Sequence, residues 1–301
     1  MSIVPLALPD RRALIRETAA SSHRRRTAGG IVAAALCLLA LLIALVPIVW
    51  IIVYTISQGL AAWSIDFFTK LPHPAGIPGG GIVNALVGSL IIDGLAALMA
   101  LPVGIFAALF LAEFSGRLAG TVRFVIDVAA GLPAITIGLF AYAVIVVPQR
   151  HFSAFSASVA LAVLMLPIVI RAGEGALRTV PNDLWEAGLA LGVRRARVAR
   201  SIVIPTAIPG LVTASLLAIS RAVGEAAPLL FTAIGSQVFS TAIFGPSGMA
   251  SLPLVVYYNG IQAYRDLQQN AWGTALTLLV IVVLLNISAR LLARRMRRFT
   301  R

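Results

Sequence analysis

Six apolar runs divide this chain, each bounded by stretches that carry charges or turn residues. We place them at residues 31–56, 83–112, 124–148, 155–177, 205–233 and 271–293. Crossing the hydrocarbon core of a bilayer takes roughly 20 helical residues, and each run is that long. In lipid, only helices and closed β-barrels can form all of their backbone hydrogen bonds. The strands of a barrel alternate apolar and polar residues, whereas these runs are continuously apolar. The pattern predicts an all-α integral membrane protein with six transmembrane helices.

A shorter apolar piece, residues 251–258, lies in the long segment between the fifth and sixth runs. It is too short to span a bilayer. Spanning there would also move the arginine-rich C-terminus to the opposite side of the membrane. We therefore expect a re-entrant or surface-lying segment.

The basic residues are sorted between alternate loops. Twenty of the 24 lie in the N-terminal tail, the second loop, the fourth loop and the C-terminus, whereas the other loops hold Lys70, Arg150 and Arg265. Positive loops stay in the cytoplasm, so both termini are predicted to be cytoplasmic. Residues 27–65 carry no charge, which is too long a run for a cleaved signal peptide. Residues 1–27 are therefore predicted to form a cytoplasmic basic tail.

Composition agrees with a membrane protein. The 301 residues are 59% hydrophobic and only 12% charged, too little polar surface for a soluble domain of this length. A net charge of +13 would otherwise suggest nucleic acid, but the arginines lie where an orientation signal places them, so the expected partner is the lipid bilayer and no nucleic acid is expected. Cys37 is the only cysteine, which excludes an internal disulfide.

The fourth loop, residues 181–205, carries the most specific pattern in the chain. Pro181 and the two residues after it are typical of a helix start, and Gly192 allows a tight turn. Three residues separate Glu186-Ala187-Gly188 from Gly192, and nine more separate Gly192 from Ile202-Val203-Ile204-Pro205. Read by itself, this is a loop with one short helix. Its spacing resembles the cytoplasmic EAA loop of ABC-importer permeases, with Gly188 in place of the second Ala and Ile204 in place of Leu.

The chain lacks the means to hydrolyse ATP itself. A phosphate-binding P-loop needs a lysine after its second glycine, and Lys70, the only lysine, is followed by Leu71-Pro72. No nucleophile stands beside a base, so an enzyme is not expected. We expect no cofactor in this chain, with ATP and magnesium bound by a partner ATPase.

Four ionisable residues fall inside the predicted helices: Asp93, Asp127, Arg221 and Glu225. Such residues are costly in lipid, about 2.5–3.5 kcal/mol each on insertion scales, so each is a functional candidate. Arg221 and Glu225 are four residues apart, which predicts one helix face carrying an anion site. The alternative is a structural ion pair.

The charged residues of the other predicted helices have more than one interpretation. Arg171 either guides an anion toward the cytoplasm or anchors its helix at the membrane surface. Asp93 and Asp127 are predicted to be polar helix contacts, with a proton relay as the alternative. Glu174 is expected to pair with Arg171 or Arg178, because they share a helix face.

A second resemblance narrows the family. The stretch from Arg221 to Ala233 is similar to the R-A-x-G-E-T-A-P-L-L-F-T-A element of the PstA-type permeases of phosphate importers, with Ala226 in place of Thr. Residues 131–140 resemble the family's G-x-P-S-I-x-x-G-L-F element, and Ser251-Leu252-Pro253 stands where the family carries S-L-P. The likeness extends from residue 28 to the C-terminus.

The resemblance implies a type I ABC-importer permease fold over residues 28–301, in the bacterial inner membrane. It implies a PstC-type partner permease, two copies of a cytoplasmic ATPase and an extracytoplasmic phosphate-binding protein. By the same resemblance, Arg171, Arg221 and Glu225 belong to the substrate pathway, and Glu186, Ala187, Gly188 and Gly192 contact the ATPase. The open alternatives are a permease for another oxyanion such as molybdate or sulfate, an ion-coupled secondary transporter, and a membrane scaffold that reports to a signalling kinase.

Overall fold

The computed structural model describes the backbone of residues 11–299 and the side chains of residues 29–295. Within that range the chain is helical, and its only β-type pairing is an isolated bridge between Ile234 and Met249. The helices are α1 (Arg11–Gly59), α2 (Ile65–Thr69), α3 (Val83–Glu113), α4 (Arg117–Gly131), α5 (Ala134–Ala141), α6 (Val147–Gln149), α7 (Ala154–Arg178), α8 (Asn182–Ala190), α9 (Arg195–Val198), α10 (Ile204–Val223), α11 (Leu229–Thr232), α12 (Leu252–Gly260) and α13 (Arg265–Phe299). A short 3₁₀ turn, η1 (Leu60–Ala62), follows α1, and π-helical turns, η2 (Tyr142–Val146) and η3 (Ala199–Val203), precede α6 and α10.

The chain divides into two compact units, residues 1–54 and residues 55–301. The first unit contains most of α1, which together with η1 forms the apolar stretch Gly29–Ala62, with a mean hydropathy of 3.2 in its 18-residue window. Because α1 begins at Arg11, residues 11–27 of the predicted tail are helical, and residues 1–10 lie outside the described range. A lone helix this apolar needs lipid or another helix to cover it.

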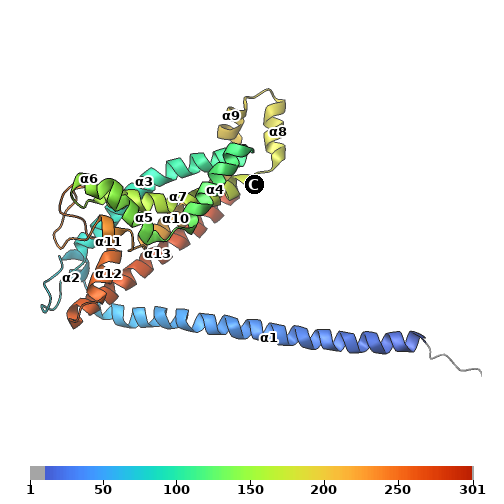
Figure 1. The fold of residues 1–301 in the computed structure, drawn as a ribbon, viewed down its shortest axis with the longest axis horizontal. Helices are drawn as coiled ribbons and strands as arrows, with labels where there is room; N and C mark the ends of the chain where they lie inside the picture. Colours follow the sequence, from blue (N-terminus) through green and yellow to red (C-terminus); the bar gives the residue numbers. More distant parts are fainter. Residues whose placement is uncertain (1–10, 300–301) are drawn as a thin grey trace, which may run out of the picture. The chain divides into compact units, whose positions relative to one another are not determined.

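The second unit, called the body below, is built on four long helices. Helix α7 packs against α3 and α10, and α10 also packs against α13 (Figure 1). The main core gathers Ile92 and Ala96 of α3 with Leu161 and Met165 of α7. Lipid supplies no hydrophobic drive between helices, so close approach at small residues holds such bundles together.

Glycines mark the closest helix approaches. A Cβ on Gly104 of α3 would lie 2.6 Å from Val169 Cγ1 of α7, and one on Gly210 of α10 would lie 2.5 Å from Ala176 Cβ of α7. Helix α7 is therefore held from both sides at positions that only glycine fits.

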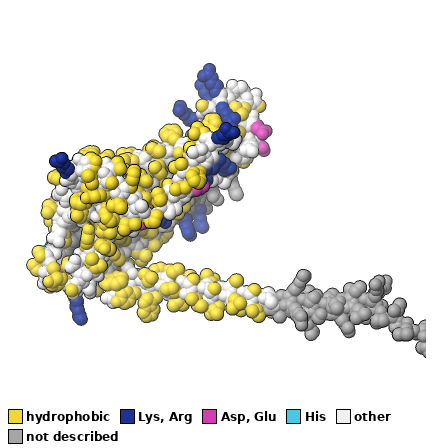
Figure 2. Space-filling model, in the orientation of Figure 1, with side chains coloured by type: hydrophobic (Ala, Val, Ile, Leu, Met, Phe, Trp, Pro, Cys, Tyr) yellow, Lys and Arg dark blue, Asp and Glu magenta, His cyan; other side chains and the backbone are white. Residues whose placement is uncertain are grey.

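The long helices of the body place its loops at two ends. Helices α3, α7 and α13 run toward the end from which α8 and α9 project, and α10 runs away from it (Figure 1). Lysine and arginine side chains gather at that end, whereas apolar side chains cover most of the flank of the body (Figure 2). The body thus brings the basic second loop, fourth loop and C-terminal helix to one end, as the charge pattern predicted.

The prediction of one continuous helix over residues 124–148 is wrong. Helices α4 and α5 meet at a 102° bend at Leu132-Pro133. A residue before proline is pushed out of the helical region, and Leu132 is extended with ψ 134°. Five helices of the described residues are long and apolar enough to cross a membrane, or six if the bent pair from Arg117 to Gln149 crosses as one.

The predicted fifth span, residues 205–233, is displaced toward the N-terminus. Continuous helix runs from Arg195 through the π turn to Val223, so Pro205 lies inside it and does not mark its start. Gly224 ends the helix, and the chain turns before α11 begins at Leu229. Pro228, which has no N–H to donate, favours this break. The predicted short segment in the following loop is present as α12.

We predict that Gly104→Ala lowers the stability of the chain by about 1–3 kcal/mol, the usual cost of overpacking, because the new methyl group overlaps Val169. The matched control is Gly94→Ala on the same helix, where a Cβ meets nothing within 4 Å. Thermal unfolding of the purified chain in detergent measures both. Equal midpoints for the two variants would contradict the packing assignment.

Candidate functional site

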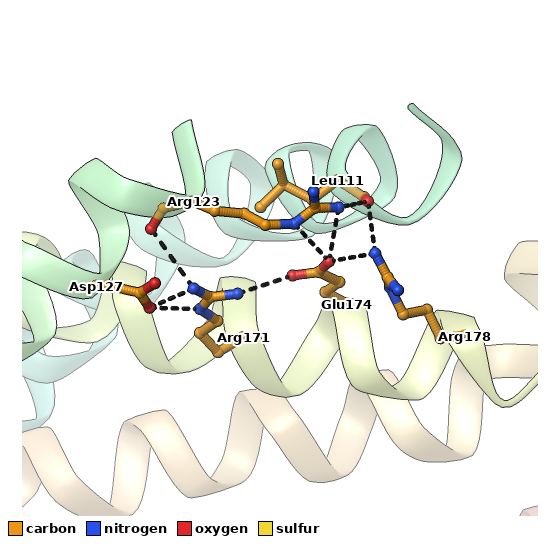
Figure 3. A network of polar contacts seen from close by, with 6 residues as sticks. All are labelled: Leu111, Arg123, Asp127, Arg171, Glu174 and Arg178. Carbon is orange, nitrogen blue, oxygen red and sulfur yellow. Dashed lines mark hydrogen bonds and ion pairs between the residues drawn. The ribbon is translucent and has the colours of Figure 1, made fainter. Parts of the chain in front are cut away.

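A cluster of three arginines and two carboxylates joins α3, α4 and α7 near the α8–α9 end (Figure 3). Glu174 is its centre, with a side chain only 7% exposed. Its Oε1 accepts a hydrogen bond from Arg123 Nε at 3.1 Å and forms an ion pair with Arg178 Nη2 at 2.9 Å, and its Oε2 accepts from Arg171 Nη1 at 3.4 Å. The predicted pairing of Glu174 is confirmed, because residues 171, 174 and 178 share one face of α7.

Arg171 has a second and closer partner in Asp127 of α4. Its Nε donates to Asp127 Oδ1 at 2.9 Å, and its Nη2 reaches the same oxygen. The guanidinium is therefore held between two carboxylates. Asp127 was predicted to be a polar helix contact, and its ion pair with Arg171 across α4 and α7 confirms that role.

The cluster also caps a helix end. The last carbonyl groups of a helix lack intrahelical partners, and Leu111 O is one of these in α3. Arg123 Nη2 donates to it at 2.6 Å and Arg178 Nη2 at 3.5 Å. Two of the arginines therefore tie the end of α3 to the same carboxylate that anchors α4 and α7. With three cations and two anions the cluster keeps one net positive charge.

Arg221 and Glu225 are not one helix face, which corrects the i, i+4 prediction. Helix α10 ends at Val223, and Glu225 lies in the turn that follows, its N–H donating to Ala222 O at 3.0 Å. The Arg221 side chain is exposed and Glu225 is half-buried. Neither side chain has an ion pair or hydrogen bond among the described residues. Arg221 thus offers an uncommitted guanidinium.

The predicted pathway residues are not brought together within this chain. Arg221 lies near the end of α10, which runs away from the α8–α9 end, whereas Arg171 lies near the end of α7, which runs toward it. The two arginines therefore stand toward opposite ends of the body, with only one of them paired.

The 181–205 loop forms a helical hairpin, residues 181–203 in this structure. Gly192 turns the chain with a φ of +74°, as predicted. Gly188 is buried, and a Cβ there would lie 2.9 Å from Val198 Cγ2, so this glycine lets α8 pack on α9. Glu186 and Ala187 are exposed, as are three leucines of α8 and the turn, Leu184, Leu189 and Leu191. The hairpin thus presents an apolar surface edged by charge.

The ion pairs of Arg123 and of Glu113 were not predicted from the sequence. Arg123 and Asp127 are four residues apart, which places both on one face of α4 and could have signalled a shared contact. Glu113, the last residue of α3, pairs with Arg195 of α9. No sequence spacing links residues so far apart.

We predict that Glu174→Gln destabilises the body by about 2 kcal/mol, below the 3–5 kcal/mol typical of fully buried pairs because the three arginines reach solvent. Asp127→Asn removes a carboxylate that is 58% exposed, so we expect a cost of about 1 kcal/mol or less. Unfolding midpoints in detergent compare the two. A larger loss for Asp127→Asn would contradict the central role of Glu174.

Comparison with known proteins identifies the family. Residues 100–298 match the family described as binding-protein-dependent transport system inner membrane component. The chain is 37% identical over 247 residues to the phosphate transport system permease protein PstA of Yersinia pestis, covering 81% of this chain and 83% of that protein. It is 42% identical over 240 residues to PstA of Xylella fastidiosa, covering 79% and 83%. With PstA 1 of Mycobacterium tuberculosis it shares 39% over 267 residues, covering 85% of each.

Solved structures confirm the predicted ABC-importer permease fold. The inward-facing MetNI methionine ABC transporter matches with a TM-score of 0.58 at 21% identity, covering 71% of this chain and 95% of that chain. A bacterial alginate ABC transporter in complex with its periplasmic protein matches with a TM-score of 0.59 at 12% identity, covering 86% and 94%. The chain therefore belongs to the binding-protein-dependent transport system inner membrane components and, within them, to the PstA family of phosphate transport system permease proteins.

Proposed function

We propose that this chain is the membrane permease subunit of an ATP-driven importer of inorganic phosphate. The relationship to PstA proteins, at 37–42% identity over about four-fifths of the chain, carries this proposal. As a permease subunit it forms half of the translocation pathway and leaves ATP hydrolysis to a partner. The helical hairpin at the arginine-rich end supports a docking role toward that partner.

The finer assembly follows from the same relationship. A PstC-type permease completes the pathway, two copies of a cytoplasmic ATPase bind ATP and magnesium, and an extracytoplasmic protein delivers phosphate. We place the chain in the bacterial inner membrane with both termini in the cytoplasm, because the arginine-rich end of the body then faces inward. Residues 28–301 form the permease domain, and residues 1–27 form a cytoplasmic tail.

Arg221, Glu225 and Arg171 are proposed to serve the phosphate pathway. A guanidinium binds an oxyanion with two parallel hydrogen bonds, and Arg221 is exposed and uncommitted. Glu225, just beyond the helix end, moderates the positive charge, which keeps binding weak enough for release. Arg171 is held by two carboxylates, so phosphate must compete with Asp127 for it.

Uptake of radiolabelled phosphate into proteoliposomes tests the function. The vesicles hold this chain, its co-expressed partner permease and the ATPase, with ATP inside and the binding protein outside. We expect ATP-dependent uptake that excess molybdate and sulfate leave unchanged. Uptake inhibited by those anions would favour a permease for another oxyanion, and uptake driven by an ion gradient without ATP would favour a secondary transporter.

We predict that Arg221→Gln abolishes measurable uptake while the complex still assembles. Each lost charge-assisted hydrogen bond is worth about 1.5–3 kcal/mol, or roughly 10- to 100-fold. The matched control is Arg290→Gln on α13, an exposed arginine that loses the same charge away from the proposed pathway. Normal uptake by Arg221→Gln would remove the anion-site assignment.

We predict that Gly192→Glu and Glu186→Lys uncouple the ATPase. Gly192 holds a positive φ that other residues resist, and Glu186 lies exposed on α8 with Ala187. ATP hydrolysis stimulated by loaded binding protein reports coupling, and Glu186→Gln separates loss of charge from its reversal. Stimulation that survives in both variants would show that the ATPase docks elsewhere.

A further inference from the structure

The hairpin is tied to α3 by one ion pair. Glu113 is the last residue of α3, and its Oε1 accepts from Nε of Arg195, the first residue of α9. Within the described part of the chain, this is the one ion pair between residues 181–205 and the helices outside them. Glu113 and Arg195 are 82 residues apart in sequence, so only the fold brings them together.

The two sides of this pair differ in their surroundings. The Glu113 side chain is 7% exposed, and its second oxygen, Oε2, is buried without a hydrogen-bond partner. The Arg195 side chain is 61% exposed, and its guanidinium carbon lies 5.6 Å from the centre of the Trp185 ring on α8. Arg195, on α9, therefore contacts two other helices: α8 through Trp185 and α3 through Glu113.

Burial makes this contact hard to break. A buried carboxylate whose only cationic partner leaves becomes an uncompensated charge. Glu113 has no second cation among the described residues, and its free oxygen has no hydrogen bond to fall back on. The hairpin cannot move away from α3 without incurring that penalty, so a displacement of α9 favours movement of α3 with it.

Helix α3 is well placed to carry such a movement through the body. It packs along α7 at Gly104, where Val169 allows no closer approach. Its end is capped at Leu111 O by Arg123 of α4 and Arg178 of α7. A pull on Glu113 thus acts on the helix end that the arginine cluster ties to α4 and α7.

We propose that the Glu113–Arg195 ion pair is a coupling link, which transmits displacement of the hairpin to α3 and so to the substrate pathway. The inference rests on the proposed function, in which the hairpin receives the ATPase. Glu113 and Arg195 are positioning residues in this scheme: neither touches phosphate or ATP. Their loss separates ATP hydrolysis from phosphate movement.

The competing explanation is that apolar packing alone transmits the displacement. Val198 and Val203 of the hairpin side pack with Ala108 of α3 and Leu177 of α7 in a small core. That core is untouched by changes to Glu113 or Arg195. If it suffices, removing the ion pair leaves the number of phosphate ions moved per ATP unchanged.

The experiment measures phosphate uptake and ATP hydrolysis together in proteoliposomes that hold the complete complex, with loaded binding protein outside. The variants are Glu113→Gln, Arg195→Gln and the double variant. The matched control is Arg290→Gln on α13, which removes an exposed arginine outside the hairpin with no ion pair among the described residues. Co-purification of the ATPase and partner permease measures assembly.

We expect each single variant to keep its ATP hydrolysis and to move at least about fivefold less phosphate per ATP, the lower range for coupling between distant sites. The double variant should lose no more than either single one, because all three remove the same contact. Arg290→Gln should match the unaltered complex.

Unchanged phosphate per ATP in both single variants would overturn the coupling link, as would additive losses in the double variant. If Arg195→Gln alone weakened assembly, Glu113→Gln would decide, because it changes α3 and leaves the hairpin surface intact. Failure of the proposed function is distinguished by the unaltered complex, which would then show no ATP-dependent phosphate uptake.

Discussion

A single buried carboxylate, Glu174, is the interaction on which the functional end of the body depends. Three arginines from two helices converge on it, and two of them also cap the end of a third. Without this anion the same cations would repel one another beside an apolar core. With it, α3, α4 and α7 share one fixed corner, next to the hairpin that we propose as the ATPase contact (Figure 3).

The cluster also changes how Arg171 is understood. Read from the sequence, it was either an anion guide or a membrane anchor. In the structure it is bound by Asp127 and Glu174, so in this state it is a structural cation. Its guanidinium is committed to these carboxylates, so binding an anion there would require a shift that separates them. Arg221 needs no such shift, because its side chain has no partner among the described residues.

Helix breaks in the body coincide with its charged and proposed pathway residues. Proline ends the helical backbone after α4, and a glycine followed by a proline does so after α10. Such breaks are tolerated in membrane proteins where other groups satisfy the freed backbone. The break after α10 leaves Arg221 near a helix end and Glu225 in the turn that follows, so the two side chains do not share a helix face. An unbroken helix would have fixed them as a pair.

Much of this protein was readable from its sequence. The apolar runs determined an all-helical membrane protein, because lipid tolerates no unpaired backbone, and the arginine pattern sorted the loops that the body then places at one end. Pro181 indicated the start of the short helix that forms α8, and Gly192 the turn after it, because proline and glycine act directly on the local backbone.

The tertiary structure decided which residues that are far apart in the sequence come into contact. Only the fold brings Arg123 to Glu174 and Arg195 to Glu113, because each pair joins residues of different helices that are far apart in the sequence. It also packed Gly188 against Val198 within the hairpin and parted Glu225 from the helix of Arg221. Charge and hydropathy fix which residues avoid lipid, whereas packing geometry fixes which of them meet.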